Sequence, residues 1–274
     1  MTITELQDTA REVRRQILRT THAAGCGHTG GSLSEADILT ALFFRVMNVD
    51  PADPRRADRD RFILSKGHAT PGYYAALALR GFFDVDELLS FDRIDSRLQG
   101  HPDMHKTPGV DFSSGSLGQG LSAGIGMRLA GRERGLDFSV FVLLGDGESQ
   151  EGQVWEAALY AGSHRVSGLV GITDVNAVQL SESVANTLDL GPLAAKWQAF
   201  GWTVLETDGH DMDNLVAVLE EAKSRSADRP VMLLARTVKG KGVSFMEGDY
   251  HWHGRAPNDG EYEQALAELA EGSR

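Results

Sequence analysis

Short apolar runs alternate with longer amphipathic stretches along most of the chain. The runs are rich in aliphatic and β-branched residues and predict buried strands at 139–145, 168–174, 202–208 and 230–237. A further short apolar run at 61–67 ends in Lys-Gly. Apolar residues at helical spacing predict helices at 5–20, 34–47, 69–81, 152–164, 190–200 and 211–226. Ser34, followed by Asp37, is expected to begin the second of these helices. Strands that alternate with helices predict an α/β fold, in which helices cover both faces of a parallel sheet.

The chain is predicted to form one domain. Its 274 residues are enough for a sizeable core. No repeat, low-complexity tract or linker divides them, so a single domain over residues 1–274 is expected.

Composition and charge narrow the classes of function. Hydrophobic residues make up 41% and charged residues 24%, as in ordinary globular proteins. The formal net charge of −12 argues against a nucleic-acid partner, because binding phosphates needs clustered Lys and Arg. No apolar run approaches the roughly 18 residues of a membrane helix, and the polar start is not a secretory signal. Cys26 is the only cysteine, so no intrachain disulfide can form and a cytoplasmic location is expected.

The stretch "VFVLLGDGESQEG" at 140–152 places Asp146 at the carboxyl end of a predicted strand, where open α/β sheets bind ligands. If the strand at 168–174 is its parallel neighbour, Asn176 lies just past the second strand end and within reach. A carboxylate, an amide oxygen and a main-chain carbonyl suit Mg²⁺ or Ca²⁺, and Mg²⁺ often keeps positions for phosphate oxygens. The alternative is an aspartate that caps a helix and an asparagine in an ordinary turn.

A second candidate is the glycine-rich stretch "SSGSLGQGLSAGIGMRLAG" at 113–131, which opens a predicted helix. Main-chain N–H groups at such a helix start can bind a phosphate. The spacing does not match G-x-G-x-x-G, so a dinucleotide fold is not indicated. Small residues here could also serve close packing alone.

Four histidines lie beside glycines in predicted loops: His28, His68, His101 and His253. They lack the short spacing of a zinc site, and one cysteine cannot supply a thiolate cluster. Histidines that hold no metal suit hydroxyl binding, proton transfer and phosphate contact near neutral pH. A single loop histidine is usually only a surface residue, but four in such turns favour a site.

Taken in order, the motifs "GHTGGSLS", "SKGHA", "GHPD", "GSLGQG", "GDGESQEG", the downstream asparagine and a final "HG" resemble transketolase. The resemblance covers nearly the whole chain and is to the amino-terminal, diphosphate-binding part of that family. Gly-Asp-Gly followed about thirty residues later by Asn resembles the magnesium–thiamine diphosphate site of the family. The pyrimidine-binding and carboxy-terminal domains are not in this sequence, so the chain resembles the small subunit of split, two-chain transketolases.

The resemblance implies roles for particular residues. The metal ligands would be Asp146, Asn176 and the main-chain carbonyl of Val178. The residues that bind the cofactor would be His68, Gly115, Leu117, Gly145, Asp146, Gly147, Glu151, Asn176 and His253. His28, His101 and His253 would act on the sugar, the first two by binding hydroxyls of the donor. Glu151 would also lie at the subunit contact. Cys26 and Ala177 depart from the residues that are frequent at their positions, and His251 has no counterpart.

The implied activity is transfer of a two-carbon ketol unit from a ketose (phosphate) to an aldose, with thiamine diphosphate and Mg²⁺ (or Ca²⁺) as cofactors. The glutamate that activates the cofactor in this family belongs to the pyrimidine domain. A second subunit, the carboxy-terminal transketolase subunit that carries that domain, is therefore expected as partner, with the pair forming a heterotetramer. The chain alone is expected to be inactive.

Other interpretations stay open on sequence grounds. The alpha subunit of a two-oxo-acid dehydrogenase shares Gly-Asp-Gly and the downstream asparagine but lacks the "SKGHA" and "GHPD" histidines. A specialised thiamine diphosphate enzyme of secondary metabolism could transfer a two-carbon unit from pyruvate or a ketose to an unusual acceptor. A non-catalytic regulatory relative would be expected to have lost metal-binding or sugar-binding residues, which are all present here. A plain nucleotide-binding protein is disfavoured by the glycine spacing.

Overall fold

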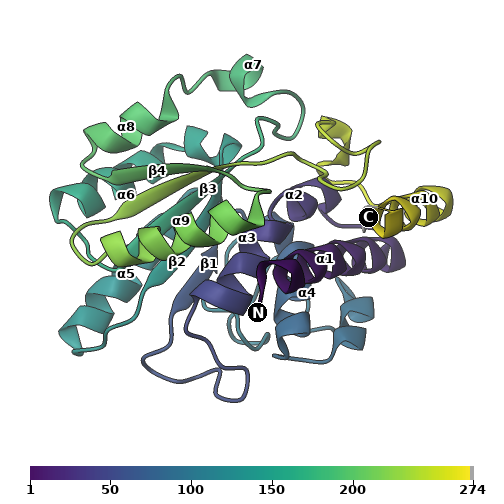
Figure 1. Cartoon of the computed structure of the whole chain (residues 1–274), viewed down its shortest axis with the longest axis horizontal. Helices are drawn as coiled ribbons and strands as arrows, with labels where there is room; N and C mark the ends of the chain where they lie inside the picture. The colour runs from purple at the N-terminus through teal and green to yellow at the C-terminus, as the bar shows by residue number, and fades with distance from the viewer. Residues whose placement is uncertain (272–274) are drawn as a thin grey trace.

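A computed structural model describes residues 1–271 of the chain. Within that range, one sheet contains five parallel strands in the order β1-β2-β3-β5-β4 (Figure 1). Their bounds are β1 Arg61–Leu64, β2 Val140–Gly145, β3 Leu169–Val175, β4 Thr203–Asp208 and β5 Val231–Arg236. Strands β2, β4 and β5 lie within predicted runs, β3 extends one residue beyond its run, and β1 lies in the short apolar run at 61–67. The predicted α/β class with a parallel sheet is confirmed.

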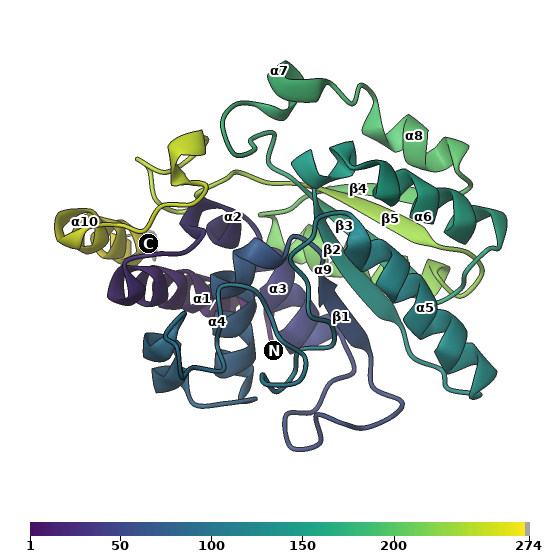
Figure 2. The same cartoon turned by 180° about the vertical axis from the view of Figure 1, so that it is seen from behind.

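Helices cover both faces of this sheet. Figure 2 shows α5 and α6 in front of the strands, with α8 above them, whereas α9 and α3 lie on the face seen in Figure 1. The helices are α1 Ile3–Ala24, α2 Thr29–Ser34, α3 Ala36–Ala41, α4 Thr70–Arg80, α5 Gln119–Glu133, α6 Gly152–Ser163, α7 Val184–Leu188, α8 Leu193–Ala199, α9 Met212–Arg225 and α10 Asp259–Glu271. The sheet is therefore the middle layer of three.

The central strand β2 explains why these runs are continuously apolar. Val140 and Val142 pack into the cluster under α5 and α6, whereas Phe141 and Leu143 point into the cluster under α3, α4 and α9. Since both faces are covered, alternation between polar and apolar residues is lost. A third cluster, which includes Val13 and Leu269, joins α1 to α10.

The predicted start of the second helix is wrong. Helix α2 already begins at Thr29, and a separate α3 follows from Ala36, extended by a π-helical turn at Leu42–Val46. The Ser34 hydroxyl lies 2.7 Å from the Asp174 carboxylate and 2.9 Å from the Gly31 carbonyl, which compete for its one proton, so it does not cap a helix. Buried Asp174 draws this serine into the core, a long-range contact that no local signal predicts.

Two further differences concern helix positions. The predicted helix at 190–200 is α8, which begins at Leu193, and α7 and α10 were not predicted. The predicted single domain over 1–274 stays a prediction, and its last residues, 272–274, lie outside the described residues.

Candidate active site at the carboxyl edge of the sheet

A cavity of about 470 Å³ opens at the carboxyl ends of β2 and β3. All of the residues that the sequence singled out for cofactor, metal or sugar line this cavity: His28, His68, His101, Gly115, Leu117, Gly145, Asp146, Gly147, Glu151, Asn176, Val178 and His253. They come from the turns after β1, β2 and β3, from the loop before α5, and from the segments before α2 and after β5. The fold therefore gathers into one place groups that are far apart in the chain.

Strand register brings Asp146 and Asn176 together. Gly145 pairs with Asp174 across β2 and β3, so the next residues leave both strands side by side. The Asp146 carboxylate accepts N–H bonds from Gly147 at 2.8 Å and from Ala177 at 2.6 Å. Asn176 Oδ1 accepts from the Val178 N–H at 3.1 Å. The turn that carries the asparagine is thus tied directly to the aspartate.

These groups fit a hard divalent cation. Burial, and then the charge of Asp174, raise the pKa of Asp146 to about 6. The positive charge near this carboxylate is therefore too small to offset its burial. Val178 presents its main-chain carbonyl on the same side, where it accepts a 3.3 Å bond from Lys239 Nζ. Within residues 1–271 no cluster of three His, Cys, Asp or Glu side chains forms a metal site. A set of one carboxylate, one amide oxygen and one carbonyl, completed by phosphate oxygens, suits Mg²⁺ or Ca²⁺.

Three buried ionisable side chains lie beneath this edge of the sheet. Lys66 Nζ lies 2.7 Å from Asp174 Oδ2 and 2.8 Å from Glu35 Oε2, and all three side chains are almost completely buried. Asn176 Nδ2 donates to the same Asp174 oxygen at 3.0 Å. Burial opposes the charge of Asp174, but Lys66 outweighs it and lowers the pKa of that carboxyl. Asp174 therefore stays ionised and fixes the amide of Asn176.

Three of the four histidines form one cluster. The ring centroid of His28 lies 4.8 Å from that of His68 and 5.3 Å from that of His253, and the last two are 5.1 Å apart. Burial lowers the pKa of His68 to about 2 and that of His253 to about 3, helped by neighbouring positive charge. The two imidazoles are therefore neutral near pH 7, and neutral rings can both donate and accept hydrogen bonds. His101 lies apart from this cluster, next to Gly115.

The glycines on either side of Asp146, and Gly115, are needed for space rather than for unusual backbone angles. Neither Gly145 nor Gly147 has a positive φ, so the turn around Asp146 does not require them. A Cβ on Gly147 would meet Gln179 at 3.1 Å, and one on Gly115 would meet the His101 ring at 3.2 Å. At the start of α5, the Gly118 N–H donates to Glu148 Oε1 at 2.8 Å. This N–H is already occupied, so the suggested phosphate cradle at the helix start does not include it.

Sequence reasoning missed three charged residues that line the cavity. Lys66, Glu148 and Lys239 are all buried there. Burial, and then the charge of Lys66, lower the pKa of Lys239 to about 8. Its ammonium lies 2.7 Å from His253 Nδ1, which leaves Nε2 as the protonated nitrogen of that ring. The run "KGKG" at 239–242, just past a strand end, was an available signal for such a cation.

Comparison with known proteins gives the class of this chain. Residues 6–270 match the family model for the thiamine diphosphate binding domain of transketolase. A 6-deoxy-6-sulfo-D-fructose transketolase subunit from Clostridium sp. (strain MSTE9) is 44% identical, with 97% of this chain and 96% of the relative covered. An apulose-4-phosphate transketolase subunit from Actinobacillus succinogenes is 43% identical over the same shares.

Solved structures of transketolases have the same fold as this chain. Transketolase from Campylobacter jejuni superposes with a TM-score of 0.92 at 29% identity, over 98% of this chain and 43% of that one. The chain thus spans less than half the length of that transketolase. These matches define a transketolase-type transferase fold. The chain belongs to the transketolase family, as its thiamine diphosphate binding domain, and the resemblance seen in the sequence is confirmed.

Proposed function

We propose that this chain is the amino-terminal subunit of a two-chain transketolase that transfers a two-carbon ketol unit from a ketose phosphate to an aldose. The observation that carries the proposal is the convergence of every predicted site residue on one cavity. The relatives named as subunits act, by their names, on a sulfonated sugar and on a sugar phosphate, which supports a ketose donor without fixing which one. A cytoplasmic location is part of the proposal.

Asp146, Asn176 and the carbonyl of Val178 would hold Mg²⁺, and the metal would hold the diphosphate. Lys239, His68 and His253 would also contact the diphosphate, with Gly115, Leu117, Gly145 and Gly147 leaving room for it. When bound, thiamine diphosphate supplies a carbanion nucleophile and an electron sink.

The histidines would handle the sugar. His28 and His101 line the same cavity and would bind hydroxyls of the donor. As a neutral ring with a defined protonated nitrogen, His253 can donate toward a sugar oxygen from a stated atom, Nε2. Such a group commonly contributes about 10²–10⁴-fold to rate.

A partner subunit would complete the site. Glu151 lines the mouth of the cavity and is exposed, as expected for a residue at a subunit contact. Leu180, which also lines the cavity, is 67% exposed, and Leu159 on α6 and Leu188 on α7 are exposed as well. Apolar side chains at this edge support a partner that covers it, in a heterotetramer. Within residues 1–271, no helix is both long and apolar enough to cross a bilayer.

The test uses the chain together with the partner that it retains from its native cells. We expect the pair to transfer ketol units from a ketose phosphate in the presence of Mg²⁺ and thiamine diphosphate, and the chain alone to be inactive. Pyruvate in place of the ketose phosphate separates this activity from that of an oxo-acid enzyme. Turnover by the isolated chain, or by the pair with pyruvate only, would contradict the proposal.

The same complex tests the metal site. Asp146→Ala is expected to abolish Mg²⁺-dependent binding of thiamine diphosphate, measured by calorimetry, because the one carboxylate of the proposed set is lost. Asp137→Ala, which removes an exposed aspartate outside the cavity, is the control and should bind as the wild type does. Unchanged affinity in the first variant would refute the assignment.

A further inference from the structure

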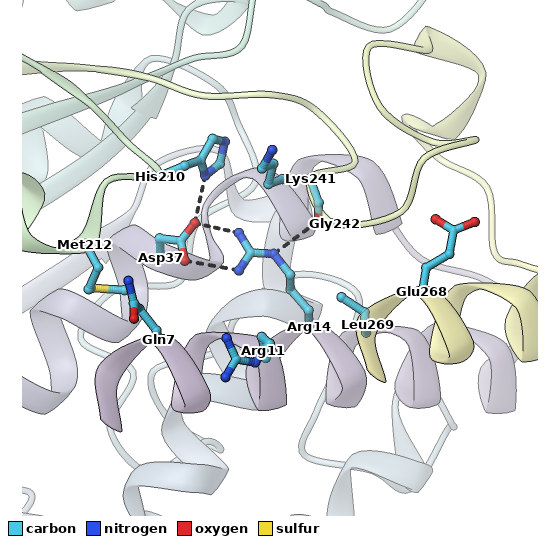
Figure 3. A pocket seen from close by; sticks show the side chains of 10 residues that line it. All are labelled: Gln7, Arg11, Arg14, Asp37, His210, Met212, Lys241, Gly242, Glu268 and Leu269. Atoms are coloured by element: carbon cyan, nitrogen blue, oxygen red, sulfur yellow. Dashed lines mark hydrogen bonds and ion pairs between the residues drawn. The ribbon is translucent and has the colours of Figure 1, made fainter. Parts of the chain in front are cut away.

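A second cavity, of about 610 Å³, lies between α1, α3, α10 and the segments that follow β4 and β5. Figure 3 shows Arg14, Asp37 and His210 joined by hydrogen bonds within it. We call these three residues the clamp. None of them lines the proposed cofactor site.

The clamp has a defined pattern of donors and acceptors. Arg14 donates from both terminal nitrogens to the two Asp37 oxygens, at 3.1 and 2.6 Å. His210 Nδ1 lies 2.7 Å from Asp37 Oδ2, and His210 Nε2 accepts the Val238 N–H at 2.9 Å. A main-chain N–H can only donate, so Nε2 is unprotonated and Nδ1 carries the proton toward Asp37. The ring orientation and tautomer of His210 are thereby fixed.

Both ends of the clamp hold one turn of the main chain. The turn runs from Val238 to Lys241, and the Lys241 N–H closes it on the Val238 carbonyl at 3.1 Å. His210 accepts from the first N–H of the turn, and Arg14 Nε donates to the last carbonyl, that of Lys241, at 3.0 Å. Gly240 within the turn has φ +79°, and its N–H donates to the Gly30 carbonyl at 3.0 Å.

Lys239, the second residue of the turn, extends into the proposed cofactor cavity. Lys239 Nζ reaches the Val178 carbonyl at 3.3 Å and His253 Nδ1 at 2.7 Å. Its stem passes Gly30, where a Cβ would meet Lys239 Cγ at 3.2 Å. The clamp and the lysine ammonium thus lie at opposite sides of the same turn.

The clamp is rigid enough to act as a support. Arg14 and Asp37 are 6% and 7% exposed, and their two parallel bonds form a bidentate, charge-assisted pair. Burial opposes the charge of Asp37, but Arg14 and His210 outweigh it and lower the pKa of the carboxyl to about 2. The pair therefore stays ionised at any pH at which the enzyme would work.

We infer that Arg14, Asp37 and His210 are positioning residues that set the place of Lys239 in the cofactor site through the turn at 238–241. This inference rests on the proposed function, because it assumes that Lys239 contacts the diphosphate. A role limited to joining helices would not require two side chains to end on main-chain atoms of one turn. No residue of the clamp touches the cofactor or the reacting atoms.

A double-mutant cycle tests the inference on the two-subunit complex. Lys239→Ala, His210→Ala and the double variant are compared by the dissociation constant of thiamine diphosphate at saturating Mg²⁺. We expect each single variant to weaken binding by about tenfold, the effect of one lost charge-assisted contact. The double variant should bind no more weakly than Lys239→Ala, since the two residues act through one contact.

Two conservative variants separate positioning from loss of folding. In His210→Gln the side-chain oxygen can reach the place of Nε2 and accept from Val238, so affinity should be largely retained. In His210→Asn the shorter amide can keep the bond to Asp37 but cannot reach Val238, so affinity should fall. Amide exchange at Val238, measured on the full chain without cofactor, should be slow in the wild type and the Gln variant and fast in the Asn variant.

His22→Ala is the matched control, because His22 forms a similar pair with Asp259, at 2.8 Å, between α1 and α10. It should leave cofactor affinity unchanged. If Lys239→Ala binds as the wild type does, the proposed cofactor contact fails. If Lys239→Ala weakens binding but His210→Ala has no effect, or an effect that adds fully to it, the clamp inference alone is overturned.

Discussion

At the scale of single residues, Lys239 carries a testable pH dependence. Its pKa of about 8 means that the ammonium of the free protein loses its proton in the alkaline range. A diphosphate bound at the proposed site would favour the protonated form, so above pH 8 binding would also take up a proton. Affinity for thiamine diphosphate should therefore fall by about twofold from pH 7 to 8 and then more steeply, by up to about tenfold per pH unit.

Calorimetry of the complex between pH 7 and 9.5 checks this expectation. Lys239→Met should bind more weakly at pH 7 and lose the alkaline fall. Lys241→Met removes a nearby, partly exposed lysine and should keep it. An alkaline fall that persists in Lys239→Met would assign the titration to another group.

The backbone conformation of Ala177 should have a measurable cost in the free energy of unfolding. It has φ 63°, a left-handed conformation that is unfavourable for residues with a Cβ, and its N–H donates to Asp146. Ala177→Gly should leave the free energy of unfolding unchanged or raise it by up to about 1 kcal/mol, since relief of strain offsets the greater freedom of the unfolded chain.

Ala177→Val should have the opposite effect, because a β-branched residue is poorly tolerated at this φ. We expect a loss of about 1–2 kcal/mol and weaker Mg²⁺ binding, as the turn that holds Asn176 is displaced. Urea denaturation and metal titration measure both. Equal stability of the Gly and Val variants would show that the left-handed turn does not matter.

At the scale of elements, close contact between α6 and the turn after α8 leaves no room for a side chain at Gly162. A Cβ on Gly162 of α6 would lie 1.7 Å from the Phe200 carbonyl oxygen, which is main chain and cannot rotate away. Gly162→Ala should therefore lower the free energy of unfolding by about 1–3 kcal/mol or more. Gly126 on α5 has no atom within 4 Å of its Cβ position, so Gly126→Ala should instead stabilise by about 0.4–1 kcal/mol.

Urea denaturation of both variants, each read at the midpoint and slope, tests this pair. A glycine-to-alanine change is the same chemistry in both helices, so the difference reports packing alone. Similar midpoints for the two variants would mean that α6 and the turn at Phe200 separate easily.

The strands and helices also show which parts of the fold local sequence patterns can predict. The strands were predicted because buried parallel strands are continuous apolar runs, a property of the segment itself. The start of α2 was missed because Ser34 is directed by Asp174, which is distant in the chain. Helix α10 was missed although "EYEQALAELAE" has helical spacing, an available signal.

At the scale of the whole molecule, the gathering of the site depends on strand order. The residues that the family resemblance named all line one cavity, because motifs after neighbouring strands end at one edge. Lys239 follows β5, and β5 lies between β3 and β4. Nothing in the local sequence states that order, so the approach of Lys239 to Val178 could not be predicted from spacing.

The same strand order has a consequence for how the protein folds. Every neighbouring pair in the sheet is parallel, so no two strands are joined by a hairpin, and Arg61 must find Val140 across a loop on the order of 80 residues. Closing such loops makes folding slow. Helical signal should return first in refolding, and the ability to bind Mg²⁺ should lag behind it, which stopped-flow circular dichroism and a metal-sensitive dye can resolve. During synthesis, the proposed metal site cannot form until the strands beside β2 have been made, so we expect the emerging chain to depend on protection from aggregation for longer than a hairpin-built protein of equal size.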